Sequence, residues 1–267
     1  WEVICNNKEV TNPGPIFESI NGVPVTTIGE QAFCECTSLT SITLPDSITT
    51  IGECAFRNCT SLESIDLSNC TNLMTIGQSA FDSCASLESI TLPDSVTSID
   101  AYAFRNCTSL TSIILPEGLS TIKTGTFYEC TSLESIDLSK CTNLTTVDSC
   151  AFYKCGSLTS IDFSKSNLTT IVGYAFYYCR SLTNIAIPES VISIGSSAFY
   201  YCRSLKSIAI PDSITTIGEK AFSNCTSLTN ITFNSTMEQW STITLGTQWK
   251  SFVPATKVVC SDGDVTL

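Results

Sequence analysis

Paired carboxylates are the residues of this chain that come closest to a catalytic constellation. The candidates are Glu63 with Asp66, Glu134 with Asp137, and Asp162, because two carboxylates on either side of a glycosidic bond can hydrolyse it. Histidine is absent from the 267 residues, which removes the commonest general base and the Ser–His and Cys–His nucleophile pairs. The sequence also contains no Walker motif, no Gly-x-Gly-x-x-Gly after a strand and no Gly-x-Ser-x-Gly.

The segments that carry these carboxylates argue against catalysis. Around Ile65 and Ile136 apolar and polar residues alternate, which is the period of a half-buried strand. On an open sheet nothing would desolvate a carboxylate or raise its pKa. We therefore predict that the chain is not an enzyme and holds no cofactor or metal.

A repeat of 23 to 25 residues organises the chain, and one copy, residues 28 to 48, reads IGEQAFCECTSLTSITLPDSI. Each copy has Phe at a fixed position, Leu six residues later and Ile nine residues later. A self-similar unit of this length predicts a solenoid in which neighbouring coils bury one another's apolar residues. The nine phenylalanines are Phe33, Phe56, Phe81, Phe104, Phe127, Phe152, Phe176, Phe199 and Phe222.

Within each copy we expect one strand and one tight turn. The repeated Ile predicts a strand that stacks into a parallel sheet on the concave side. Proline ends most of these strands, because it cannot donate to the ladder. Ser68, Ser139 and Ser164 replace that proline in the longer copies, where we expect a small bulge. The Gly-x-x-Ala-Phe-x-x-Cys segment is too short for a full helix and predicts one helical or 3₁₀ turn.

The repeat resembles the BspA-like, or treponemal-type, leucine-rich repeat family. The resemblance rests on Ala-Phe, on Cys-x-Ser-Leu-x-x-Ile-x-Leu-Pro and on the spacing of 23, and it covers roughly residues 20 to 234. It implies a strand-dominated leucine-rich-repeat solenoid of the α/β class without catalytic activity. Members of this family are typically surface proteins of mucosal bacteria and protozoa, and some mediate adhesion to host matrix proteins or other microbes.

We expect three regions: an N-terminal cap at 1–22, the repeat array at 23–234 and a C-terminal cap at 235–267. A solenoid needs caps over its terminal cores. The apolar residues expected to make the cap contacts are Trp1, Val3, Ile16, Phe17 and Ile20 at one end, and Met237, Trp240, Ile243, Trp249, Phe252, Val258 and Val259 at the other. The Asp262-Gly263-Asp264 segment resembles a fragment of a calcium loop, but a tight turn explains it better.

Nine of the sixteen cysteines occupy one repeat position. We predict that they form a buried column of free thiols, since a free Cys packs as a small hydrophobe with a weak donor. Parallel side chains in a line suit neither disulfides nor tetrahedral zinc. Cys5 and Cys260 lie in opposite caps, so we do not expect them to pair. The column consists of Cys36, Cys59, Cys84, Cys107, Cys130, Cys155, Cys179, Cys202 and Cys225.

Two surfaces are candidates for binding. The residues flanking the repeated Ile are mostly Ser and Thr, with Asp66, Asp137 and Asp162 making the middle acidic. This face is either a plain solvated sheet or a shallow acceptor for a basic or glycan partner. The second surface is a run of aromatic and basic residues, of types that dominate interface hot spots, although the rings could simply stabilise the array. Its members are Tyr128, Tyr153, Tyr177, Tyr178, Tyr200, Tyr201, Arg180 and Arg203.

Composition narrows the choice of partners. A net charge of −12 argues against nucleic acid and anionic membrane surfaces as partners, and there is no apolar run long enough for a transmembrane helix. The chain opens at Trp1 without Met, so we expect a processed or trimmed protein whose signal and anchor segments lie elsewhere.

We therefore predict a secreted or cell-surface recognition protein that adheres to host matrix proteins or other cells. Fold-level transfer of function is weak, so two alternatives stay open. One is a carbohydrate-binding module for polysaccharide capture, and the other is a structural spacer that displays another domain.

Overall fold

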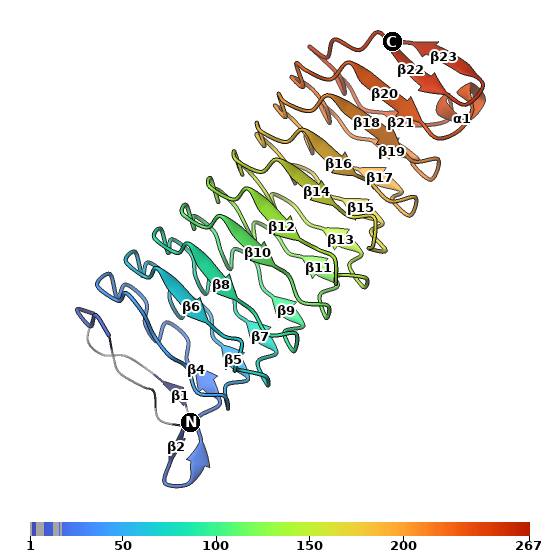
Figure 1. Ribbon diagram of the computed structural model, residues 1–267. Coiled ribbons are helices and arrows are strands. Elements are labelled where there is room, and N and C mark those ends of the chain that lie inside the picture. The colour runs from blue at the N-terminus through green and yellow to red at the C-terminus, as the bar shows by residue number, and fades with distance from the viewer. Residues whose placement is uncertain (1, 4–7, 13–15, 17) are drawn as a thin grey trace.

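The computed structural model describes residues 2–3, 8–12, 16 and 18–267, and it is an elongated solenoid with the two chain ends at opposite tips (Figure 1). Successive coils stack along one axis, so each coil contacts mainly its two neighbours. This is the architecture that the repeat predicts. Trp1, Cys5 and Phe17, which the sequence assigns to the N-terminal cap, lie outside the described residues.

One row of parallel strands contains the repeated Ile and is called the Ile row here. From β6 to β14 its strands have the burial pattern exposed–buried–exposed, with Ile65 and Ile90 facing inward in register. Hydrogen bonds join them as β6–β8, β10–β12, β14–β16 and β18–β20–β22. The strands are β6 (Ser64–Asp66), β8 (Ser89–Thr91), β10 (Ser112–Ile114), β12 (Ser135–Asp137), β14 (Ser160–Asp162), β16 (Asn184–Ala186), β18 (Ser207–Ile210), β20 (Asn230–Phe233) and β22 (Lys257–Cys260).

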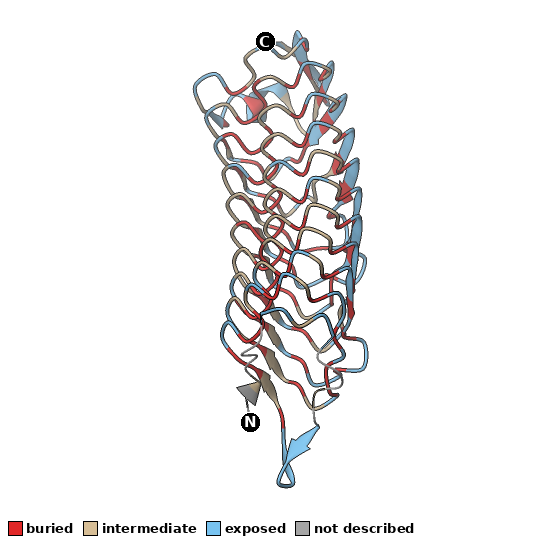
Figure 2. Ribbon diagram, turned by 90° about the vertical axis from the view of Figure 1, so that its left-hand side faces the viewer, coloured by how far each residue is buried: buried red, intermediate tan, exposed pale blue. Residues whose placement is uncertain are grey.

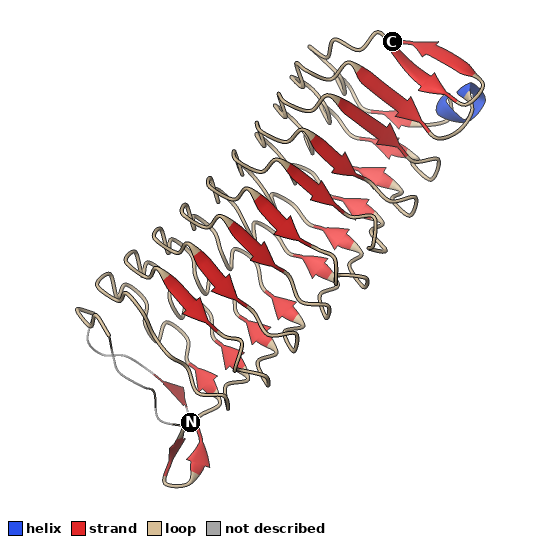
Figure 3. Ribbon diagram, viewed as in Figure 1, coloured by secondary structure: helices blue, strands red, loops and turns tan. Residues whose placement is uncertain are grey.

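Each coil also has a second strand, which the sequence reading of one strand per repeat missed. These strands are only two residues long, and they run on the opposite side of the coil (Figure 3). They form two ladders, β1-β4-β5-β7-β9 and β11-β13-β15-β17-β19-β21. Their bounds are β1 (Glu2–Val3), β4 (Thr27–Ile28), β5 (Thr50–Ile51), β7 (Thr75–Ile76), β9 (Ser98–Ile99), β11 (Thr121–Ile122), β13 (Thr146–Val147), β15 (Thr170–Ile171), β17 (Ser193–Ile194), β19 (Thr216–Ile217) and β21 (Thr244–Leu245).

The segment around each Phe is a chain of hydrogen-bonded turns rather than a continuous 3₁₀ helix. Cys36 N–H donates back to the carbonyl of Phe33 at 3.0 Å, while Phe33 N–H donates to the carbonyl of Ala55 in the next coil at 2.7 Å. Residues two before and two after the Phe have left-handed backbones, as at Gln31 (φ 54°) and Glu35 (φ 62°). The left-handed residues interrupt the helical path. Successive backbone N–H groups therefore alternate between a carbonyl of the same coil and a carbonyl of the next coil.

The core consists of columns in which the same residue type is buried in successive coils, and buried residues recur from coil to coil along the solenoid (Figure 2). The nine phenylalanine rings stack in parallel, and the ring centroids of Phe33 and Phe56 are 5.2 Å apart with an interplanar angle of 1°. The predicted thiol column is also present. Cys59 Sγ–H donates to the carbonyl of Phe33 at 3.0 Å, and Cys130 Sγ–H to that of Phe104 at 3.0 Å. No disulfide joins any two of the fifteen cysteines among the described residues.

At the C-terminal end the chain adds a strand to each side of the solenoid. Strand β21 extends the ladder of two-residue strands, β22 extends the Ile row, and β23 (Gly263–Thr266) folds back on β22. The helix α1 (Met237–Trp240) contributes the buried Trp240, which packs edge-on against Phe233, and Trp249 packs likewise against Phe222. Phe252 is not a cap contact as expected. It is 78% exposed, and its backbone is left-handed with φ of 62°.

At the N-terminal end Val3 and Ile16 pack against the core, as the cap prediction requires. Ile20 does not, because it lies in a projecting hairpin of β2 (Ser19–Ile20) and β3 (Val23–Pro24) and is 40% exposed. The proposed division of the chain after residues 22 and 234 stays a prediction.

Candidate binding surface

Four tyrosines stack along one flank of the solenoid, each from a different coil. Ring centroids are 4.5 Å apart for Tyr128 and Tyr153, 4.9 Å for Tyr153 and Tyr177, and 5.0 Å for Tyr177 and Tyr200. Interplanar angles are 11° or less. Each tyrosine directly follows the buried Phe of its coil, so the inner phenylalanine column sets the spacing of the outer column. All four rings are half-buried.

A second, shorter column lies beside the first. Tyr178 and Tyr201 stack with centroids 4.5 Å apart, and both have a left-handed backbone with φ of 62°. The ring of Tyr178 also lies 4.8 Å from that of Tyr177, tilted by 34°. The six tyrosines, at 128, 153, 177, 178, 200 and 201, therefore form one continuous surface, which we call the tyrosine face.

Cations cover part of the tyrosine face. The Arg180 guanidinium lies 4.9 Å from the ring centroid of Tyr178, and that of Arg203 lies 4.6 Å from Tyr201. Lys154 Nζ is 5.3 Å from the ring of Tyr153 and forms an ion pair with Glu129 at 2.7 Å. These distances are in the range of cation–π attraction. The sequence analysis grouped Arg180 and Arg203 with the tyrosines, whereas it did not indicate Lys154, which lies beside Tyr153.

Stacking leaves the tyrosines with exposed edges rather than exposed faces. Tyr153 and Tyr177 each have a ring on both sides, so neither offers a face to a ligand. Burial and the neighbouring tyrosines raise the pKa of Tyr177 to about 12. Its hydroxyl therefore stays protonated at neutral pH and can both donate and accept a hydrogen bond.

The three aspartates of the Ile row have structural partners. Asp66, Asp137 and Asp162 each end a strand in a longer coil, and the Oδ1 atom accepts the backbone N–H two residues later at 2.9, 2.8 and 2.8 Å. The donors are the serines that replace proline, so the aspartate forms the turn that proline forms elsewhere. These backbone hydrogen bonds lower the pKa of each carboxyl. A lowered pKa is the opposite of what a general acid needs.

The aspartates and the tyrosine face are not brought together. The aspartates end the strands of the Ile row, whereas the tyrosines lie in the turn segment that precedes those strands. The candidate residues thus divide between two segments of the coil.

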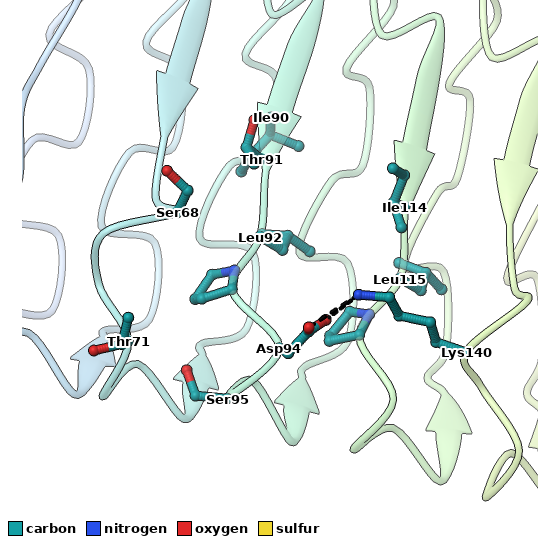
Figure 4. Close-up of a pocket in the computed structure, with 12 residues that line it drawn as sticks. Ser68, Thr71, Ile90, Thr91, Leu92, Asp94, Ser95, Ile114, Leu115 and Lys140 are labelled. Carbon is teal, nitrogen blue, oxygen red and sulfur yellow. Dashed lines mark hydrogen bonds and ion pairs between the residues drawn. The ribbon is translucent and has the colours of Figure 1, made fainter.

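A groove that the sequence did not indicate is lined at one end by Ser68, the serine whose N–H bonds to Asp66 (Figure 4). It has a volume of about 570 Å³, and Leu92, Pro93, Ile114 and Leu115 give it an apolar lining. Lys140 Nζ reaches across one intervening coil to Asp94, with bonds of 2.8 and 2.9 Å to the two carboxylate oxygens. Ser68 and Lys140 lie in the turns of two of the longer coils. Two shorter coils run between these turns, and the groove lies there.

Within the described part of the chain, no group of three or more His, Cys, Asp or Glu side chains is arranged to hold a metal ion. The same residues include no helix with the length and apolar character needed to cross a membrane.

Comparisons with known proteins point to one family. A model described as the BspA type leucine rich repeat region matches residues 26–155 and 145–246. A crystal structure of a leucine-rich repeat protein from Bacteroides ovatus is 32% identical, with a TM-score of 0.80; the match covers 94% of this chain and 63% of that one. This chain therefore spans less than two thirds of the length of that relative.

A second solved structure is named a leucine rich cell surface protein and comes from Faecalibacterium prausnitzii. It is 25% identical with a TM-score of 0.50, and the match covers 88% of this chain and 90% of that one. The comparison with curated proteins finds no match.

Proposed function

Because the chain belongs to the BspA-type leucine-rich repeat family, we propose that it is a secreted or cell-surface recognition protein that binds a protein partner on a host matrix or another cell. The family consists of non-enzymatic repeat proteins that are typically secreted or surface-located. The name of the F. prausnitzii relative, a cell surface protein, supports this location. The proposed contact surface is the tyrosine face.

The stacked tyrosine columns carry this proposal. Tyr and Arg are the residues most enriched in interface hot spots. Here each ring is fixed by its neighbours at 4.5 to 5.0 Å. A surface already ordered before binding loses little conformational entropy when a partner docks. The exposed edges and hydroxyls suit the polar contacts of a protein interface.

A module that captures neutral polysaccharides is less well supported. Sugar rings pack against an aromatic face, and the inner tyrosines have none free, because each is covered on both sides. Only the end rings of each column could offer such a face.

The test is binding of the purified chain to a panel of matrix proteins at physiological salt. The test variant replaces Tyr128, Tyr153, Tyr177 and Tyr200 by serine, the residue that stands at this position in another coil as Ser223. A second variant changes Tyr177 and Tyr200 to phenylalanine, which keeps the stack and removes two hydroxyls. The matched control changes the exposed Met74 and Ile192, away from the tyrosine face, to serine.

We expect the serine variant to lose binding while its circular dichroism spectrum stays that of the parent, and the control to bind normally. Partial loss in the phenylalanine variant would assign part of the contact to the hydroxyls. Binding that survives the serine variant would overturn the assignment of the tyrosine face. Binding to no member of the panel would favour the spacer alternative.

A further inference from the structure

Arg180 and Arg203 stand at the same position of two successive coils, where the repeat usually has threonine. The threonines are Thr37, Thr60, Thr108, Thr131 and Thr226. The two guanidiniums lie 4.9 and 4.6 Å from the centroids of Tyr178 and Tyr201, whose own centroids are 4.5 Å apart. The charges therefore lie side by side, separated by about one coil spacing, or about 5 Å.

Neither guanidinium has an anionic partner among the residues that the structure describes. The other two arginines, Arg57 and Arg105, both pair with Asp82. No such ion pair involves Arg180 or Arg203.

The surrounding sequence is basic although the whole chain has a net charge of −12. Residues 163–211 carry four basic side chains and one acidic side chain, a net charge of +3; these are Lys165, Arg180, Arg203 and Lys206 against Glu189. The Glu189 carboxylate already accepts a hydrogen bond from Asn234 at 2.7 Å. Two adjacent cations without an ion-pair partner thus stand in a stretch of sequence with a net positive charge, which Asp162 and Asp212 bound on either side.

We propose that Arg180 and Arg203 form a binding site for the sulfate esters of a sulfated polysaccharide. A sulfate ester has three terminal oxygens, so one group lying between the two guanidiniums can accept hydrogen bonds from both. A carboxylate has two oxygens, which a single guanidinium can occupy in a bidentate pair. A tetrahedral oxyanion therefore uses the twin arrangement better than a carboxylate does.

A linear anionic polymer fits the surroundings better than a single modified side chain. Arg180 and Arg203 come from consecutive coils, so their charges follow one another along the solenoid axis; Lys154, from the preceding coil, is paired with Glu129. The adjacent tyrosine hydroxyls can hydrogen-bond sugar hydroxyls between the charged groups. Nucleic acid fits poorly, because the inner tyrosine rings leave no free face on which bases could stack. This inference rests on the proposed function only in treating the tyrosine face as the contact surface.

The experiment measures binding of the purified chain to dextran sulfate, with neutral dextran and polyglutamate as comparison polymers, at physiological salt. The test variant is Arg180→Thr with Arg203→Thr, which restores the usual residue of the repeat and should leave the fold intact. The charge-matched control is Lys140→Thr with Lys257→Thr, because both lysines are exposed and lie outside the tyrosine face and outside residues 163–211. Inorganic sulfate is added as a competitor.

We expect the parent chain to bind dextran sulfate, the arginine variant to lose about tenfold or more in affinity, and the lysine control to stay within about twofold. Inorganic sulfate should compete, and neutral dextran should not bind. Equal losses of affinity in both variants, or binding of polyglutamate as tight as that of dextran sulfate, would show that net charge alone explains the binding. Either result would overturn the proposed site. No binding of dextran sulfate would also overturn it.

The outcome is separable from that of the proposed function. If the four-tyrosine serine variant loses a protein partner while the arginine variant keeps dextran sulfate, the proposed function stands and this inference fails. If the arginine variant alone loses dextran sulfate and the serine variant keeps its protein partner, the anion site stands and the protein surface lies elsewhere.

Discussion

Arg105 binds both carboxylate oxygens of Asp82, with Nε to Oδ1 at 2.9 Å and an Nη atom to Oδ2 at 2.6 Å. Arg57, from the coil on the other side, lies 3.5 Å from the same carboxylate. Asp82 is 1% exposed. These three residues occupy the same repeat position as Tyr128 and Tyr153, so a column that is ionic in the early coils becomes aromatic in the middle ones.

Asp82→Ala is expected to lower the free energy of unfolding by about 2 kcal/mol, because it leaves two guanidiniums facing each other without their shared carboxylate. Urea unfolding followed by circular dichroism measures the change. The control is Glu219→Gln, which removes an exposed ion pair with Lys220 and should leave the midpoint almost unchanged. Equal midpoints for Asp82→Ala and the parent would mean that the ion triplet does not stabilise the stack.

The thiol column predicts a loss of stability in alkali. Burial raises the pKa of Cys59 from 9.0 to about 12, and that of Cys225 likewise. The folded state therefore keeps protons that the unfolded state releases above about pH 9. The stabilisation that each buried thiol gives the folded state is complete below about pH 9. As pH rises from there toward the native pKa, this stabilisation falls by about 1.4 kcal/mol per pH unit for each thiol.

The test replaces Cys59 and Cys225 by serine, whose hydroxyl can donate to the same Phe carbonyl but does not titrate in this range. Unfolding midpoints are compared at about pH 8 and about pH 10.5. The variant should lose less stability than the parent between these two values. Parallel losses would show that the alkaline transition has another origin.

The Phe and Cys columns of the core could be predicted because the same residue type stands at the same position in neighbouring coils. Phe33 stacks on Phe56, and Cys59 bonds to the coil below it, so a fixed position in the sequence becomes a line in space. Pairs such as Thr50–Ile51 were not predicted as strands, since two residues are too short to show an alternation. They become strands because the register of neighbouring coils aligns them.

Features that depend on differences between coils were not predictable in the same way. Lys140 reaches Asp94, which is 46 residues earlier in the sequence, and no local pattern signals that contact. The groove exists only because the longer turns stand beside shorter ones. The role of Asp66 had a visible signal, since the aspartate is two residues before the serine that replaces proline.

Gly125→Ala is expected to destabilise the chain. Gly125 has a φ of 60°, and an added Cβ would lie 2.3 Å from a ring carbon of Tyr102. The left-handed backbone alone costs about 1 kcal/mol for a non-glycine residue, and the overlap with the ring adds about 1 to 3 kcal/mol. Thermal unfolding measures the loss. Adding Tyr102→Ala should recover the part due to the ring, and a double variant as unstable as the sum of the single changes would contradict the contact.

The aspartate turns predict a loss of stability in acid. The Ser139 N–H holds the pKa of Asp137 below its ordinary value of 3.8, and the pKa values of Asp66 and Asp162 are lowered likewise. The folded state therefore binds protons less readily than the unfolded state, so this stabilisation is present above about pH 4 and is lost as pH falls through the native pKa values.

Changing all three aspartates to asparagine keeps an acceptor oxygen for each turn and removes the titrating group. The midpoint of this variant should fall less than that of the parent between about pH 5 and about pH 2.5. A control with Asp46, Asp212 and Glu63 changed to their amides should behave like the parent, and an acid response equally altered in both variants would assign the effect to net charge.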